Sequence, residues 1–162
     1  MGTIEDYKNR SLLCGIRKAL DILDIANDLP IQDDRLERVM EKIRAFEPIC
    51  IAIAEASELI RSSRSVALGE RVCRELHPDS EATQSVFLDE LAEAMIRSGH
   101  ARPATVDESV LALQQHSGHP LIISKVSGRY QEICASHLPT CVFWKAEKQG
   151  LHCLKRRHGT KA

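Results

Sequence analysis

Apolar residues recur at helical spacing through the first two thirds of the chain. The first stripe would lie on one face of a helix and comprises Leu13, Ile16, Leu20 and Leu23. A capping pair, Thr3 with Asp6, precedes this stripe. Pro30 follows it, and proline cannot continue a helix. The pattern therefore predicts a first helix from about Ile4 to Asn27.

Two more helical segments are expected in the next part of the chain. Asp33 or Asp34 can cap the first of them, whose apolar stripe is Leu36, Val39, Met40, Ile43 and Phe46. After Pro48, residues 49–54 are apolar on nearly every side. A helix of that kind belongs in the centre of a bundle, where its neighbours shield it from water.

Three further helices are predicted before the pattern changes. A short one should contain Val66, Val72, Cys73 and Leu76. The next begins near Ser80 and ends at Gly99, and its apolar stripe is Phe87, Leu88, Leu91 and Met95. Thr105 and Glu108 form a capping box, which begins a last helix that stops at Gly118.

The pattern after Gly118 no longer has a clear helical period. Residues 121–123 are a short, β-branched run, and residues 130–134 fit one or two helical turns. Residues 140–144 have the β-branched and aromatic content of a strand, and residues 151–154 could pair with them. We therefore expect a small β-hairpin near the C-terminus.

Together these elements predict a mainly α fold. We expect an antiparallel bundle of five or six helices over residues 1–118, followed by a small Cys/His-rich appendage over residues 119–162 that holds the hairpin. A chain of 162 residues lies within the usual range of a single domain, so residues 1–162 are treated as one. With 43% hydrophobic and 28% charged residues, the composition is ordinary for a globular protein.

The sequence also indicates a compartment. No stretch approaches the roughly 18 apolar residues of a membrane span, so we expect a soluble protein without a membrane partner. Glu5 and Asp6 stand where a secretory signal would carry basic residues. We therefore expect a cytoplasmic location or another reducing compartment. Thiols stay reduced there, so the six cysteines are expected to be free thiols or metal ligands.

Cysteine and histidine gather near the C-terminus, where six residues from Cys134 to His158 are of these two types. A structural zinc ion takes four such ligands in a tetrahedron. The candidate ligands are Cys134, His137, Cys141 and Cys153, with His152 as the alternative to Cys153 because adjacent strand residues face opposite sides. The spacing does not match the standard finger patterns, so zinc is a hypothesis for this segment.

Two other interpretations of the same residues stay open. In the one we favour, Cys134, Cys141 and Cys153 pack inside a small core, because cysteine is commonly buried as a plain apolar residue, and the histidines lie at the surface. In the other, one of these thiols is a redox sensor whose pKa is lowered by Lys145 and Lys155. The sequence contains no nucleophile elbow, phosphate-binding glycine loop or metalloprotease motif.

Positive charge is concentrated at the C-terminal end. Residues 145–162 contain six Lys and Arg against one Glu, a net charge of +5, although the whole chain has a net charge of −1 at pH 7. Lys155, Arg156 and Arg157 could contact phosphates while Trp144 stacks on a base. A solvated basic terminus is the simpler explanation, given the nearly neutral chain.

These observations favour a non-catalytic binding or regulatory module. It would act through protein–protein contacts on a helical face, with a C-terminal appendage stabilised by zinc. The apolar segment 49–54 would also allow self-association, although burial within one chain is the simpler expectation. The alternative is a nucleic-acid-binding protein that uses the basic tail. A third hypothesis is an enzyme or redox sensor that uses a C-terminal thiol.

Overall fold

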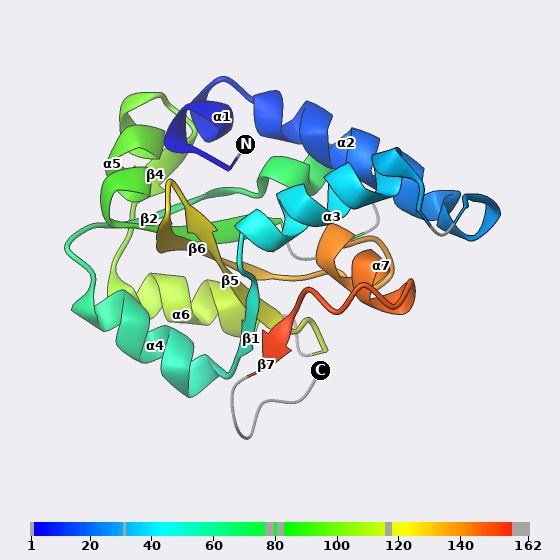
Figure 1. Cartoon of the computed structure of the whole chain (residues 1–162). Helices are drawn as coiled ribbons and strands as arrows, with labels where there is room; N and C mark the ends of the chain where they lie inside the picture. Colours follow the sequence, from blue (N-terminus) through cyan, green and yellow to red (C-terminus); the bar gives the residue numbers. More distant parts are fainter. Residues whose placement is uncertain (1, 31, 77–79, 81–82, 116–117, 157–162) are drawn as a thin grey trace.

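The computed structural model has an α/β fold built around one mixed sheet (Figure 1). It describes residues 2–30, 32–76, 80, 83–115 and 118–156. The helices are α1 (Ile4–Lys8), α2 (Ser11–Asp24), α3 (Asp34–Ala45), α4 (Ile53–Ser62), α5 (Asp89–Arg97), α6 (Val106–Gln114) and α7 (Val142–Lys148), with the short 3-10 helices η1 (Ala26–Asp28) and η2 (Val72–Leu76).

The sheet has seven strands in the order β4-β2-β3-β6-β5-β1-β7. The strands are β1 (Ile49–Ile51), β2 (Val66–Glu70), β3 (Gln84–Leu88), β4 (Ala101–Pro103), β5 (Leu121–Val126), β6 (Arg129–Ala135) and β7 (Lys155–Arg156). Neighbouring strands run antiparallel except β1 and β7, which are parallel. The strand β6 pairs with β3 on one side and β5 on the other, so it lies in the middle of the sheet.

The predicted helical bundle is wrong, because four of the segments expected to be helical contain strands. Residues 49–51, 66–70, 84–88 and 129–135 are all extended. All three residues of β1 are buried, as are four of the five in β3. A strand covered by helices on both faces is apolar at successive positions, so its sequence pattern cannot be told from that of a buried helix.

The C-terminal segment is not an appendage either. β5 and β6 lie inside the sheet, and residues 142–148 form helix α7 where a strand of a hairpin was expected. The strand near residue 155, β7, pairs in parallel with β1 and not with residues 140–144. The predicted first helix is likewise divided into α1 and α2 at Arg10, whose φ of 66° is left-handed and cannot continue a helix.

Three predicted helix caps are confirmed, whereas the helix start near Ser80 is wrong, because α5 begins at Asp89 with Leu88 as its N-cap. Thr3 with Asp6 forms a capping box at α1, and Thr105 with Glu108 forms another at α6. The Asp33 side chain accepts a hydrogen bond from a backbone N–H at the start of α3. Capping depends on residues within one turn of each other, so the sequence shows it directly.

Helices α4 and α6 cover one face of the sheet, below it in Figure 1. The side chains on this face form an aliphatic core with those of the two helices. The sheet contributes Ile49, Ile51, Leu68, Val86, Leu88, Leu121, Ile123, Ile133 and Ala135. We call this the aliphatic face after these side chains.

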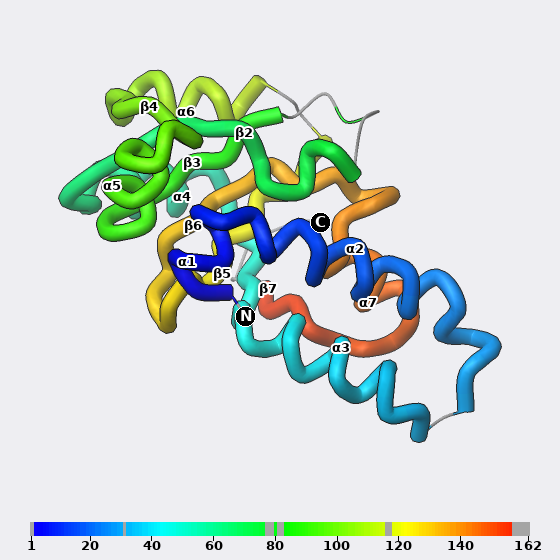
Figure 2. The backbone as a smooth tube through the Cα atoms, turned by 90° about the horizontal axis from the view of Figure 1, so that it is seen from above, coloured from blue at the N-terminus to red at the C-terminus, as the bar shows by residue number. Residues whose placement is uncertain are grey.

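The opposite face is covered in two separate places. α1, α5 and η2 pack over β2 and β3 in a cluster that includes Tyr7 and Phe87. α7 packs near β1 and β5 in a second cluster, which includes Cys141 and Trp144. Figure 2 shows α2 and α3 running side by side with α7 between them, and a third cluster joins these helices. The strand residues between these two clusters face a space that neither cluster fills.

Among the described residues, no helix is both long enough and apolar enough to cross a lipid bilayer.

Candidate functional site

The sheet register gathers polar side chains on the face opposite α4 and α6. Ser85 of β3 is the cross-strand partner of Cys134 in β6, and Ser124 of β5 is the partner of Glu132. Partners in an antiparallel pair point to the same face, and so do residues two apart along a strand. These four side chains therefore form one patch, which we call the pocket face.

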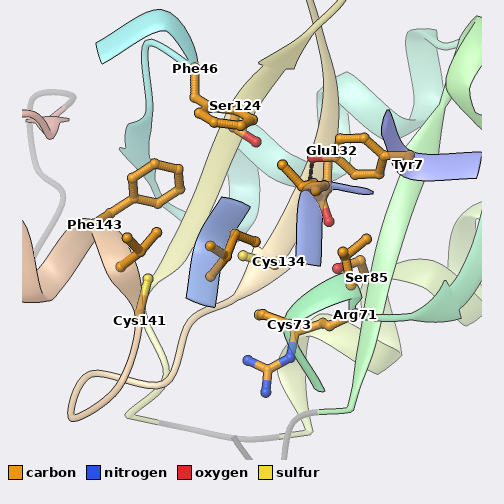
Figure 3. A pocket seen from close by; sticks show the side chains of 14 residues that line it. Tyr7, Phe46, Arg71, Cys73, Ser85, Ser124, Glu132, Cys134, Cys141 and Phe143 are labelled. Atoms are coloured by element: carbon orange, nitrogen blue, oxygen red, sulfur yellow. Dashed lines mark hydrogen bonds between the residues drawn. The ribbon is translucent and has the colours of Figure 1, made fainter. Parts of the chain in front are cut away.

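A small pocket of about 70 Å³ lies over this patch (Figure 3). Its polar walls are Tyr7, Arg71, Ser85, Ser124 and Glu132, and its thiols are Cys73, Cys134 and Cys141. Its apolar walls include Leu12 and Ile16 of α2, together with Phe46 and Phe143. The pocket thus lies between the sheet and the helices α1, α2 and α7, and residues from both ends of the chain line it.

Tyr7 closes one side of the pocket with a hydrogen bond to the sheet. Its hydroxyl donates to Glu132 Oε1 at 2.5 Å, and the side chain is 1% exposed. Burial raises the pKa of Glu132, while the hydrogen bond from Tyr7 and the charge of Arg71 oppose that rise. Burial, and then the neighbouring Glu132, raise the pKa of Tyr7 well above 10.0. The phenol therefore keeps its proton and stays a donor.

Arg71 lies at the end of β2 and lines the pocket beside Cys73 (Figure 3). The residue is only 2% exposed, although a guanidinium is charged at all ordinary pH values. Nη1 donates to the carbonyl of Ala135 at 3.2 Å, whereas Nε and Nη2 are buried and have no hydrogen-bond partner among the described residues. A buried charge with open donors is costly unless something satisfies it, so Arg71 is the most unusual group in the pocket.

The three pocket thiols come from different elements. Cys73 belongs to η2, Cys134 to β6, and Cys141 is the N-cap residue of α7. Burial raises the pKa of Cys73 to about 12 and that of Cys134 well above 9.0. Burial also raises the pKa of Cys141, although hydrogen bonds from backbone N–H groups of α7 oppose that rise. All three are therefore neutral thiols near pH 7.

The structure brings together only two of the five predicted zinc ligands. Cys134 and Cys141 line the pocket, whereas Cys153 lies in the cluster between α3 and α7, where its thiol donates to the Phe143 carbonyl at 3.5 Å. His152 is exposed beside Glu147. Within the described ranges, no group of three or more His, Cys, Asp or Glu is arranged to hold a metal ion.

His137 lies away from the pocket thiols, with other polar partners. Its Nδ1 is 2.6 Å from Thr140 Oγ1, and its ring centroid is 5.9 Å from that of His119. It does not line the pocket that Cys134 and Cys141 share. The pair with two intervening residues, Cys134 and His137, is therefore close in sequence without forming a joint site.

The residues predicted to contact nucleic acid lie at one edge of the sheet. Lys155 and Arg156 are exposed in β7, and Arg157 lies outside the described residues. Trp144 is only 5% exposed, and its indole N–H donates to Ser136 Oγ at 2.8 Å. The guanidinium of Arg156 lies over the indole at 5.5 Å from the ring centroid. A ring covered in this way does not offer a free face for a base to stack on.

Sequence reasoning missed most of the pocket. Tyr7, Arg71, Ser85, Ser124 and Glu132 were assigned no role, and Cys73 was expected to be plain packing. A weak signal does exist in the strands: Ser124 and Lys125 interrupt the apolar run of β5, and Gln131 and Glu132 precede the apolar end of β6. This signal could have been used only if the runs had been assigned to strands. In a predicted helix, the same residues would be placed on a face exposed to solvent.

Comparisons of the chain with protein-family models, with curated proteins and with solved structures found no match.

Proposed function

We propose that this protein is a non-catalytic binding module whose pocket holds a small, mainly apolar carboxylate. The observation that carries the proposal is the buried guanidinium of Arg71, which lines an apolar pocket and whose Nε and Nη2 form no hydrogen bond within the described part of the chain. A carboxylate would accept hydrogen bonds from such a fork of donors and neutralise the charge at the same time.

The walls of the pocket support an apolar body for this ligand. Aliphatic and aromatic side chains line it on the side of the helices, namely Leu12, Ile16, Phe46, Val142 and Phe143. The volume of about 70 Å³ is far below the roughly 300 Å³ of a pocket for a drug-sized molecule. The ligand should therefore be a short branched acid or a similar small anion.

A non-catalytic role is supported by the state of the pocket thiols. A thiolate is the nucleophilic form of cysteine, and burial raises the pKa of all three thiols here. This is the reverse of the environment that activates a cysteine. The hypothesis of an enzyme or redox sensor that uses Cys141 or Cys134 as a nucleophile thus gains no support from the site, and it stays a prediction.

The other hypotheses rest on fewer observations. Large exposed hydrophobic side chains in the described segments are Ile25, Leu111 and Leu138, of which only Leu111 lies on a helix. A protein partner docked on an apolar helical face remains a prediction, and so does nucleic-acid contact through Lys155 and Arg156. The pocket is the feature that argues most directly for a ligand.

Titration calorimetry with isovalerate tests the proposal, with isoamyl alcohol as the uncharged control of similar shape. We expect the wild type to bind the acid and not the alcohol. Arg71→Met should weaken acid binding roughly tenfold to a hundredfold, because it removes charge-assisted hydrogen bonds. Arg129→Met is the matched control, since Arg129 is exposed and paired with Glu90 at 3.4 Å. Equal affinity for acid and alcohol, or no effect of Arg71→Met, would contradict the proposal.

A further inference from the structure

Three of the six cysteines meet at one pocket although they are distant in the sequence. Cys73, Cys134 and Cys141 all line it, and Figure 3 shows Cys141 below Phe143, Cys134 near the centre of the view and Cys73 below Cys134. Of the other three, Cys14 is exposed and Cys153 packs between α3 and α7, whereas Cys50 is fully buried in the cluster that holds Cys141 and does not line the pocket. The gathering is therefore a property of the fold and not of local sequence.

The pocket thiols are close enough to affect one another. Cys134 packs against the cluster that contains Cys141, and ionisation of either Cys73 or Cys141 would raise the pKa of Cys134 electrostatically. None of them forms a disulfide. The site therefore presents several reduced thiols to one small volume with apolar walls.

We propose that Cys134 and Cys141 form a dithiol site for trivalent, thiol-seeking compounds of the arsenic type, with Cys73 as the third thiol of the pocket. An organic group on the arsenic would rest against the apolar walls. The two ligands would share the apolar walls of the pocket, but capture of the arsenical depends on sulfur and not on the guanidinium of Arg71, so each proposal can be tested separately.

The chemistry balances without an oxidant. With phenylarsine oxide, two S–H bonds and the arsenic–oxygen double bond break, and two arsenic–sulfur bonds form. The oxygen leaves as water with both thiol protons. Arsenic stays trivalent and sulfur is neither oxidised nor reduced. The reaction starts from neutral thiols, which is the form that burial enforces in this pocket.

Zinc is a poorer match to the same thiols. Zinc binds thiolates, and a structural site takes four ligands at fixed tetrahedral positions. The described part of the protein contains no such group. An arsenical requires only two thiols.

Trp144 provides a local reporter of this reaction. It is the single tryptophan of the chain, and it packs in the same cluster as Cys141. Arsenic bonded to Cys141 should therefore alter the fluorescence of Trp144. Reaction at the exposed Cys14 should leave it unchanged, because Cys14 is not part of that cluster.

The experiment titrates the full chain with phenylarsine oxide and follows Trp144 fluorescence and intact mass. We expect one equivalent to bind. The mass of the chain should then rise by the mass of phenylarsine oxide less that of one water. Cys134→Ser or Cys141→Ser should weaken retention about a hundredfold, because a chelate of two bonds becomes a single one. Cys14→Ser and Cys153→Ser are the matched controls and should behave as the wild type.

Further measurements keep the result interpretable. Thermal unfolding of each variant shows whether it folds, and Cys134→Ala and Cys141→Ala replace any serine variant that does not. Arg71→Met should retain arsenical capture while it loses isovalerate binding, so the two proposals can fail separately. An adduct on Cys14, unchanged retention in the Cys134 and Cys141 variants, or no adduct at all would overturn the dithiol site.

Discussion

The two faces of the sheet differ in chemistry although they share the same strands. The aliphatic face under α4 and α6 carries only apolar side chains into its cluster, among them Ile123 and Ile133. Directly adjacent residues of the same strands, Ser124 and Cys134, point to the other face and line the pocket. One face is filled by its helices, whereas the other leaves polar groups and thiols around a small volume.

This difference separates what stabilises the fold from what can bind. A close-packed aliphatic layer contributes free energy through burial and offers no recognition. Buried polar groups cost stability unless they are satisfied, so their collection around one pocket is a feature that packing alone does not explain. The pocket face, with Arg71 and Glu132, is therefore the part of the molecule to test for function.

The largest expected effect separates two adjacent residues of β6. Ile133 is fully buried on the aliphatic face, and Ile133→Ala should lower the free energy of unfolding by about 3 kcal/mol through loss of packing and a residual cavity. Cys134→Ala, on the pocket face, should cost only about 1 kcal/mol because an open volume already adjoins it. Urea unfolding measures both. Equal losses would show that the two faces are packed alike.

The next effect concerns the two tyrosines. Tyr7→Phe should lower the free energy of unfolding by about 2 kcal/mol, because it removes the donor to the buried Glu132 carboxyl. Tyr130→Phe is the control, since its hydroxyl donates to the Glu47 carbonyl at 2.9 Å and should be worth about 1 kcal/mol. Urea unfolding again gives the values. A smaller loss for Tyr7→Phe than for Tyr130→Phe would remove the special role of the Tyr7 contact.

Glu132 gives the pocket face a pH dependence. Burial raises its pKa above the ordinary 4.5 in the folded protein, so the folded state holds a proton that the unfolded chain has already released. The contribution of Glu132 to stability therefore falls as pH rises from 4.5 through the raised pKa. Glu132→Gln removes this dependence, and its stability relative to the wild type should increase with pH over that interval.

Unfolding free energies of the wild type and Glu132→Gln, measured across that pH range, give the difference directly. Taking the difference cancels carboxyls on the surface, such as Asp33 and Glu108, whose pKa values are lowered by hydrogen bonds from Arg35 and Arg102. A difference that stays constant with pH would mean that Glu132 titrates as it does in the unfolded chain.

The smallest effects compare the caps of two helices on opposite faces. Thr3→Ala at α1 and Thr105→Ala at α6 should each cost about 1 kcal/mol, because each removes the hydroxyl of a capping box. Only Thr3→Ala should also weaken isovalerate binding, since α1 carries Tyr7 into the pocket wall. Calorimetry distinguishes them. Loss of binding in Thr105→Ala would indicate a general effect of stability.

The same contrast explains how much could be predicted from the sequence. Caps at Thr3, Asp33 and Thr105 were predicted correctly because they depend on neighbours a few residues away. Strands β1, β2 and β3 were taken for helices because each contains apolar residues at successive positions. Such a run forms a strand only where helices cover both faces of the sheet, and the residues of those helices are distant in the sequence.

The candidate site was harder to predict for a related reason. Cys134 and Cys141 were singled out by their local density, and the fold does bring them to one pocket. Tyr7, Arg71 and Cys73 join them only through the sheet topology, at separations that no local spacing can reveal. Cys153, close in sequence, is directed into a different cluster by the helix α7 that replaced the expected hairpin.

The most direct test of the contrast is a methyl NMR titration of the full chain with isovalerate. Leu12 and Ile16 line the pocket, whereas Ile60 and Ile123 belong to the cluster on the aliphatic face. We predict that the methyl resonances of Leu12 and Ile16 shift with saturation, that those of Ile60 and Ile123 do not, and that Arg71→Met abolishes the shifts. Shifts at Ile60 and Ile123 instead, or none at Leu12 and Ile16, would contradict binding at the pocket face.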